Sequence, residues 1–142
     1  MVLNIPVALV KVMTNKSLIF DKIRRKYVAL TPEEEVRQLT INILNKEFNY
    51  PLTRFSLEAQ INVGKTSKRY DIVVRDKDAK PFMLIECKAK NIPITEKTFI
   101  QATNYNIQIK APYILLTNSI TTLLFYKSSE GYVQIKQIPT LI

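Results

Sequence analysis

The order of helix and strand signals along the chain constrains its fold more than any other feature. Thr31-Pro32 is a typical helix start, because threonine caps free backbone N–H groups and proline suits the first helical position. The amphipathic pattern that follows predicts a helix over residues 32–48, which Asn49-Tyr50-Pro51 ends. Strands, a second helix and further strands come next. We therefore expect a mixed α/β fold, with a mixed central sheet and a helix on each side.

The remaining elements are predicted from apolar periodicity and turn residues. Strands are expected at 57–63, 70–75, 81–89, 113–117, 122–126 and 132–135, and the second helix at 95–110. The polar turn Asp76-Lys77-Asp78 indicates an antiparallel hairpin between the second and third of these strands. Residues 7–13 and 17–20, on either side of Thr14-Asn15-Lys16, predict another hairpin near the N-terminus.

The 142 residues suit a single domain with one hydrophobic core. We expect an N-terminal hairpin or extension over 1–30, a core over 31–127 and a C-terminal tail over 128–142. No apolar run approaches the roughly 20 residues that span a bilayer, so no membrane association is expected. The absence of a recognisable signal peptide and the single cysteine, Cys87, fit a cytoplasmic protein.

Several kinds of chemistry are excluded by composition. The chain has no histidine, which excludes Ser-His-Asp and Cys-His hydrolases and histidine-ligated zinc sites. Gly64-Lys65-Thr66 looks like the end of a phosphate-binding loop, but Ala59 stands where that motif needs glycine, and a strand rather than a helix is expected next. A net charge of +9 favours a polyanionic partner, with a merely basic soluble protein as the alternative.

Two carboxylates and a lysine are expected to meet at one edge of the sheet. In a strand, alternate residues share a face, so Glu86 and Lys88 point the same way and Cys87 points to the other side. Hairpin pairing brings Asp71 close to them. Asp71, Glu86 and the Cys87 backbone carbonyl suit Mg²⁺, for which Mn²⁺ can substitute, because Mg²⁺ prefers oxygen ligands. Lys88 could position a metal-bound water and stabilise developing negative charge.

The alternative is structural. Asp71 would then be a strand-end residue, and Glu86 with Lys88 a surface ion pair worth about 0–1 kcal/mol. However, these two charges interrupt the apolar run from Phe82 to Ile85 in an expected central strand, where charges need partners or a metal. Cys87 is interpreted as a buried apolar residue rather than a nucleophile, because no histidine is present to activate it.

The motif pattern resembles a known nuclease family. Asp71 followed by Glu86-x-Lys88 resembles the PD-(D/E)XK nuclease signature, and the chain as a whole is similar to the N-terminal nuclease domain of type I restriction enzyme R subunits. The segments that carry this resemblance are Thr31-Pro32-Glu33-Glu34-Glu35-Val36-Arg37-Gln38, Arg69-Tyr70-Asp71-Ile72-Val73-Val74, Leu84-Ile85-Glu86-Cys87-Lys88-Ala89 and Gln101-Ala102-Thr103-Asn104-Tyr105.

The resemblance implies a restriction-endonuclease-like αβββαβ core, Mg²⁺ dependence and a DNA substrate. It implies that Asp71 and Glu86 are metal ligands and that Lys88 is the catalytic lysine. Gln101 and Tyr105 would contact DNA or orient the site, whereas their structural alternatives are helix surface and core. A full R subunit continues into a helicase motor, so we expect this chain either to act alone or to rely on separate restriction or helicase subunits.

Further site residues are predicted around this centre. Glu33, Glu34 and Glu35 compete to supply a third acid from the first helix; helical geometry and the resemblance favour Glu33 as an additional catalytic and metal-binding residue. Thr31-x-x-Glu34 instead predicts a capping box, in which Glu34 accepts from the Thr31 backbone N–H. The basic residues predicted to contact the DNA backbone are Lys65, Lys68, Arg69 and Lys90, and the Lys22–Lys26 cluster is either a DNA contact or a solvated loop.

The function that these features favour is an Mg²⁺-dependent DNA endonuclease linked to restriction or defence. Two alternatives remain open. One is a catalytically silent DNA-binding module, which would have no need for the trio of Asp71, Glu86 and Lys88. The other is a DNA-repair or Holliday-junction nuclease of the same fold.

Overall fold

The computed structural model describes residues 18–57, 60–63, 66–69 and 71–142, with side chains described outside 58–70. A short 3₁₀ helix, η2, covers Leu52–Arg54. The two α-helices and ten strands of the described ranges are α1 (Pro32–Phe48), α2 (Glu96–Ile109), β1 (Leu18–Asp21), β2 (Lys26–Ala29), β3 (Phe55–Leu57), β4 (Gln60–Val63), β5 (Thr66–Arg69), β6 (Ile72–Arg75), β7 (Pro81–Cys87), β8 (Tyr113–Thr117), β9 (Thr122–Ser128) and β10 (Gly131–Ile135).

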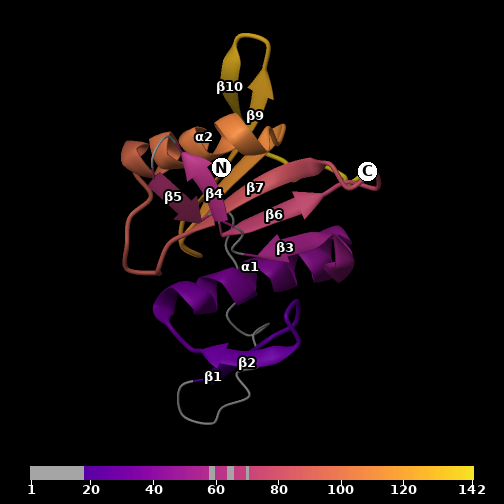
Figure 1. The fold of residues 1–142 in the computed structure, drawn as a ribbon, viewed down its shortest axis with the longest axis vertical. Helices are drawn as coiled ribbons and strands as arrows, with labels where there is room; N and C mark the ends of the chain where they lie inside the picture. The colour runs from indigo at the N-terminus through magenta and orange to yellow at the C-terminus, as the bar shows by residue number, and fades with distance from the viewer. Residues whose placement is uncertain (1–17, 58–59, 64–65, 70) are drawn as a thin grey trace.

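The central sheet has the strand order β10-β9-β8-β7-β6-β3. The β7–β8 pair is parallel and the other four pairs are antiparallel, which makes the sheet mixed. α2 forms the crossover between the two parallel strands, and α1 and α2 lie on opposite sides of the sheet (Figure 1). The predicted mixed α/β fold, with a helix on each side of a mixed sheet, is confirmed.

Side chains of β6, β7 and β8 alternate between two hydrophobic layers, because successive residues of a strand point to opposite faces. The layer under α1 contains Ile72, Val74, Met83, Ile85, Cys87 and Leu115, with Val36, Ile41 and Leu44 from the helix. The layer under α2 contains Val73, Leu84, Ile114 and Leu116, with Ala102 and Tyr105 from the helix. β7 is therefore buried on both faces, as a central strand should be.

For the N-terminal end of α1, the sequence correctly predicts the cap by Thr31 but not the capping box. Thr31 Oγ1 accepts a hydrogen bond from the Glu34 backbone N–H at 3.0 Å, so the cap is present. The predicted capping box is wrong, because the Thr31 N–H donates to the Ala29 carbonyl oxygen at 3.1 Å instead. The Glu34 carboxylate turns away from the helix end, toward Arg37 and Gln38. At the other end, Asn49 adopts a left-handed conformation with φ 60° and stops the helix.

The strand predicted over 57–63 is two strands in two sheets. β3 ends at Leu57 and pairs with β6, whereas β4 pairs with β5 in a separate two-stranded sheet. Apolar and polar residues alternate in the same way through the sequence of both strands. The local pattern therefore did not indicate that the pairing strand changes from β6 to β5.

β1 and β2 form a hairpin that the sequence did not predict, and the predicted turn at residues 14–16 lies outside the described residues. β1 pairs with β2, so the basic cluster of residues 22–26 lies at and beside the connecting turn. The Asp21 carboxylate accepts hydrogen bonds from the N–H groups of Ile23 and Arg24 at 2.8 and 3.1 Å, which stabilises this turn. The predicted arm over residues 7–13 lies outside the described residues.

The C-terminal residues pack against the sheet. β9 extends to Ser128 and β10 forms the edge strand beside it. Beyond β10, Tyr50 Oη donates to the Pro139 carbonyl oxygen at 2.6 Å, and the Lys77 N–H donates to the Ile142 carbonyl oxygen at 2.9 Å. Neither α1 nor α2, the helices of the described ranges, is long and apolar enough to cross a membrane.

Candidate active site

Asp71 lies directly beside the Glu86-Cys87-Lys88 segment. Pairing between β6 and β7 ends at Ile72 and Ile85, and Asp71 is the residue just before Ile72 in the chain. The Asp71 side chain takes over at this point: its Oδ2 accepts a hydrogen bond from the Cys87 backbone N–H at 2.8 Å. The sequence pattern predicted this approach, and the structure places the two predicted carboxylates and the predicted lysine at one edge of the sheet.

Glu86 is a buried carboxyl with an unsatisfied oxygen. The residue is 4% exposed, and Oε1 has no hydrogen-bond partner in the described part of the chain. Burial and then the charge of Asp71 raise the pKa of Glu86, Lys88 acts in the opposite direction, and the resulting pKa is about 8. A buried carboxylate without donors is costly. Its environment therefore favours either a protonated Glu86 or a bound cation.

Lys88 is held by residues of α2. Its Nζ donates to Gln101 Oε1 at 3.2 Å, and Gln101 Nε2 donates to Tyr105 Oη at 3.0 Å. Tyr105 is anchored in the hydrophobic layer under α2. Burial raises the pKa of its hydroxyl, and the hydrogen bond from Gln101 opposes this. Tyr105 thus lies in the core, which was its structural alternative, and Gln101 links it to Lys88; the roles predicted for both residues at the site stay predictions.

The three acids in the first turn of α1 separate into different surroundings. Glu33 is half exposed, at 48% of its side chain. Burial raises the pKa of Glu33, followed by the charge of Asp71, whereas Arg37 and Lys88 lower it. Glu34 is buried and binds Arg37, and Glu35 is partly exposed. Glu33 is therefore the acid whose carboxyl senses Asp71 and Lys88.

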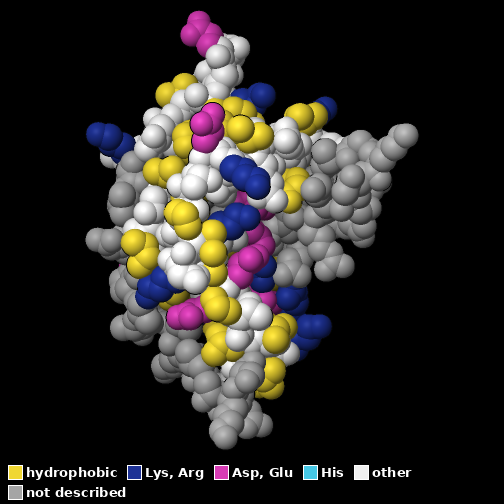
Figure 2. Space-filling view, turned by 90° about the vertical axis from the view of Figure 1, so that its left-hand side faces the viewer, with side chains coloured by type: hydrophobic (Ala, Val, Ile, Leu, Met, Phe, Trp, Pro, Cys, Tyr) yellow, Lys and Arg dark blue, Asp and Glu magenta, His cyan; other side chains and the backbone are white. Residues whose placement is uncertain are grey.

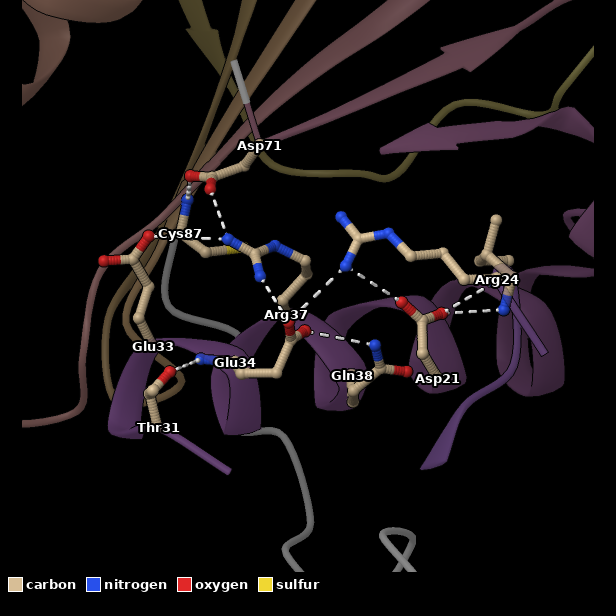
Figure 3. A network of polar contacts seen from close by, with 10 residues as sticks. Asp21, Arg24, Thr31, Glu33, Glu34, Arg37, Gln38, Asp71 and Cys87 are labelled. Carbon is tan, nitrogen blue, oxygen red and sulfur yellow. Dashed lines mark hydrogen bonds and ion pairs between the residues drawn. The ribbon is translucent and has the colours of Figure 1, made fainter. Parts of the chain in front are cut away.

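Arg37 belongs to the site but was not predicted. Its guanidinium is buried and donates to Asp71 Oδ1 and to Glu34 Oε1, each at 2.7 Å (Figure 3). Burial lowers the pKa of Arg37, but the hydrogen bond to Asp71 and its charge raise it, so the group remains a cation. Its positions three and four residues after two glutamates gave a weak signal, since such spacings place side chains together on a helix.

The predicted DNA contacts are only partly described. Lys90 is exposed in the segment between β7 and α2, two residues beyond Lys88. The backbones of Lys68 and Arg69 lie in β5, but their side chains, like Lys65, lie outside the description. These residues stay predictions.

A groove on the molecular surface borders the acids of α1. This groove of about 640 Å³ lies beside Glu33, lined by α1, β2 and the segment after β7; its lining residues are Arg24, Val28, Ala29, Thr31, Pro32, Glu33, Glu34, Arg37 and Ala89. Seen from the left-hand side of Figure 1, acidic and basic side chains lie side by side in a band that runs down the middle of the view (Figure 2). Glu33 and Arg37 line this groove, whereas Asp71, Glu86 and Lys88 are not among its lining residues.

The donor set suits a hard cation that keeps some of its waters. Among the described residues, no three Asp, Glu, Cys or His side chains form a complete metal cage. Mg²⁺ does not require one, because it is commonly bound by one or two carboxylates plus water. Asp71 Oδ1 and Oδ2 accept one hydrogen bond each, and Glu86 Oε1 accepts none. Both carboxylates therefore have lone pairs left for a metal ion.

A family model described as "Type I restriction enzyme R protein N terminus (HSDR_N)" matches residues 32–139. The chain belongs to this family. The match covers α1, the central sheet and α2, and therefore Glu33, Arg37, Asp71, Glu86, Lys88, Gln101 and Tyr105. The predicted resemblance to R subunits is thus confirmed at the level of family and fold.

Solved structures that resemble the chain include two from restriction proteins. A fragment assigned to the HsdR subunit of a type I restriction enzyme from Vibrio vulnificus YJ016 superposes with a TM-score of 0.57 and 18% identity, covering 76% of this chain and 23% of that one. The type IIG restriction endonuclease BpuSI has a TM-score of 0.44 and 19% identity, over 67% of this chain and 11% of that one. The chain spans less than a quarter of the Vibrio fragment. No curated protein sequence gives a significant match.

Proposed function

We propose that this chain is a metal-dependent deoxyribonuclease domain that hydrolyses phosphodiester bonds. The observation that carries the proposal is the buried Glu86 carboxyl, whose Oε1 has no hydrogen-bond partner among the described residues, beside Asp71 and within reach of the Lys88 charge. Such a group is destabilising in a purely structural role. It is favourable where a divalent cation joins the two carboxylates.

In this proposal Asp71 and Glu86, with the Cys87 carbonyl, hold Mg²⁺ or Mn²⁺. A bound divalent cation supplies polarisation of the scissile phosphate and a water of lowered pKa. Lys88 is directed by Gln101, at 3.2 Å, so that its ammonium can stabilise negative charge on the phosphate oxygens. Glu33 stands at the groove, partly in solvent, where its carboxylate can add an outer ligand or orient a water.

DNA is the proposed substrate because the chain combines this site with a net charge of +9. The excess charge favours the phosphate backbone and gives little base selectivity. Membership of the R-protein family supports a role in restriction, in association with other type I restriction subunits. Lys90, and Lys65, Lys68 and Arg69, are the proposed backbone contacts.

A second candidate is a DNA-binding module without catalytic activity. The observation that favours it is the 2.7 Å ion pair between Arg37 and Asp71, which already neutralises one of the two carboxylates. The two candidates differ in their response to metal, since only a nuclease needs the cation for turnover.

The test is cleavage of supercoiled, linear and branched DNA with Mg²⁺, with Mn²⁺ and with EDTA. We expect cleavage in either metal, none in EDTA, and at least about 100-fold slower cleavage by Asp71→Asn and Lys88→Ala. Lys80→Ala, at an exposed turn far from the site, is the matched control and should cleave normally. Preference for branched over linear DNA would indicate a repair or junction enzyme.

Retained DNA binding separates loss of chemistry from loss of affinity. Asp71→Asn should bind the same DNA with an unchanged or tighter dissociation constant, because it removes a negative charge. If the wild-type protein cuts no DNA form in either metal, alone or with type I partner subunits, the nuclease proposal is refuted and the binding module is favoured.

A further inference from the structure

Arg37 connects the helix acids to the sheet edge through a buried polar network (Figure 3). Its Nη2 lies 2.7 Å from Asp71 Oδ1 and its Nη1 lies 2.7 Å from Glu34 Oε1. The two carboxylates belong to different parts of the fold, one in α1 and one just before β6. The planar guanidinium therefore bridges the helix and the sheet at the candidate active site.

The partner of Arg37 in α1 is itself held in place. Glu34 Oε2 accepts a hydrogen bond from Gln38 Nε2 at 3.1 Å, and Arg24 Nη1 lies 3.9 Å from Glu34 Oε1. Arg24 in turn pairs with the fully buried Asp21 at 3.4 Å. Arg37 is thus the inner end of a charged network that extends from the β1–β2 hairpin.

The Asp71 carboxylate is fixed at both of its oxygens. Arg37 donates to Oδ1 and the Cys87 N–H donates to Oδ2 at 2.8 Å, so rotation about the side chain would break one bond or the other. Each carboxylate oxygen can accept more than one contact, so both Asp71 oxygens keep a free lone pair. Because the carboxylate is held at both oxygens, these lone pairs keep a fixed direction. We propose that Arg37 is a positioning residue that holds Asp71 in its metal-binding orientation, and that Glu34 anchors Arg37. This inference rests on the proposed function.

Two effects of Arg37 on a metal ion have opposite signs. Its positive charge repels a cation, so removing it would tighten metal binding if charge were its main contribution. Its hydrogen bonds pre-orient a ligand, so disturbing them weakens metal binding if positioning dominates, and partners of this kind commonly contribute 10- to 100-fold in affinity. Lysine separates the two effects, because it keeps the charge but lacks the planar fork that spans two carboxylates.

The experiment measures Mn²⁺ binding without DNA, by electron paramagnetic resonance of the free ion. We expect Arg37→Lys to weaken Mn²⁺ binding by about 10- to 100-fold, and Glu34→Gln to weaken it to a smaller extent. Arg54→Lys is the matched control, since Arg54 donates to the backbone carbonyls of Arg75 and Ile142, and this variant should bind Mn²⁺ as the wild type does. In cleavage assays, kcat of Arg37→Lys should fall while KM for DNA stays constant.

Unchanged or tighter Mn²⁺ binding by Arg37→Lys would overturn the positioning role. If Arg37→Lys does not unfold cooperatively, Glu34→Gln decides by the same criterion, because it is nearly isosteric and leaves Arg37 in place. A wild-type protein that binds no Mn²⁺ refutes the proposed function and this inference with it. Wild-type binding that both variants retain in full refutes the inference alone.

Discussion

Replacing Glu86 with glutamine is expected to stabilise the metal-free protein more at pH 8 than at pH 5. Burial, and then the charge of Asp71, raises the pKa of the Glu86 carboxyl from 4.5 to about 8. Between these values the carboxyl is protonated in the folded protein and ionised in the unfolded chain. The unfolded chain therefore binds fewer protons, and stability falls as pH rises through this window.

The magnitude follows from the width of the window. At about 1.4 kcal/mol for each pH unit, the Glu86 carboxyl costs about 4 kcal/mol of folding free energy at pH 8 and less than about 1 kcal/mol at pH 5. Glutamine has the same shape and no charge, so the variant escapes this cost. The buried amide adds a penalty of its own, but that penalty is the same at both pH values and cancels in the comparison.

Urea unfolding followed by circular dichroism, at pH 5 and pH 8 in EDTA, measures the effect. The gain in free energy of unfolding for Glu86→Gln should be about 3 kcal/mol larger at pH 8 than at pH 5. Glu47→Gln, at an exposed position near the end of α1, is the matched control and should show no such difference. Saturating Mg²⁺ should stabilise the wild type and narrow the gap, because a ligand that binds the folded state raises its stability. An equal gain at both pH values would refute this account of Glu86.

Four further measurements address other parts of the molecule. Thr31→Ala should lower the free energy of unfolding by about 0.5–2 kcal/mol, measured in urea, because the cap of α1 is lost; cleavage per folded molecule should not change. Glu33→Gln should slow plasmid cleavage about tenfold or more with little change in Tm, and full activity would remove this half-exposed acid from the site. Gln101→Ala should lower kcat without changing DNA affinity, because Lys88 loses its hydrogen-bond partner; a changed Kd instead would indicate direct DNA contact. Fluorescence anisotropy should show DNA affinity falling steeply with salt, as +9 implies, and a flat profile would point to another kind of partner.

The parts of the fold that the sequence predicted are those decided by neighbouring residues. α1 begins after Thr31 and ends before Asn49, because a side-chain cap and a left-handed asparagine act within one turn. The β6–β7 hairpin follows from the turn at 76–78, where Asp76 Oδ1 accepts from the N–H groups of Asp78 and Lys80. Period-two alternation then correctly placed Glu86 and Cys87 on opposite faces of β7.

The parts that the sequence did not predict depend on distant partners. The same alternation runs through β3 and β4, yet only β6 decides where the central sheet ends and the separate hairpin begins. Tertiary contacts make this choice, because the local sequence pattern is the same in both strands.

The candidate site shows the same division. Asp71, Glu86 and Lys88 could be grouped from spacing because they lie at the adjoining ends of two paired strands, β6 and β7. Arg37 could not be grouped with them from spacing, because Asp71, the carboxylate that it contacts, is 34 residues away in the sequence. The contact between Arg37 and Glu34 also explains why the predicted capping box is wrong. The guanidinium is a stronger partner for the Glu34 carboxylate than the Thr31 N–H is, because hydrogen bonds between charged groups are stronger than those to a neutral donor.

At the end of β6, a side chain takes the place of a backbone carbonyl in the sheet. The Cys87 amide is bonded to the Asp71 carboxylate, whereas its neighbours in β7 are bonded within the ladder. The amide proton of Cys87, which is buried, is thereby hydrogen-bonded to a carboxylate of the candidate site. When a metal ion binds Asp71, the chemical shift of this proton and its exchange with solvent should change. Metal binding can therefore be followed at this one amide, without DNA and without catalysis.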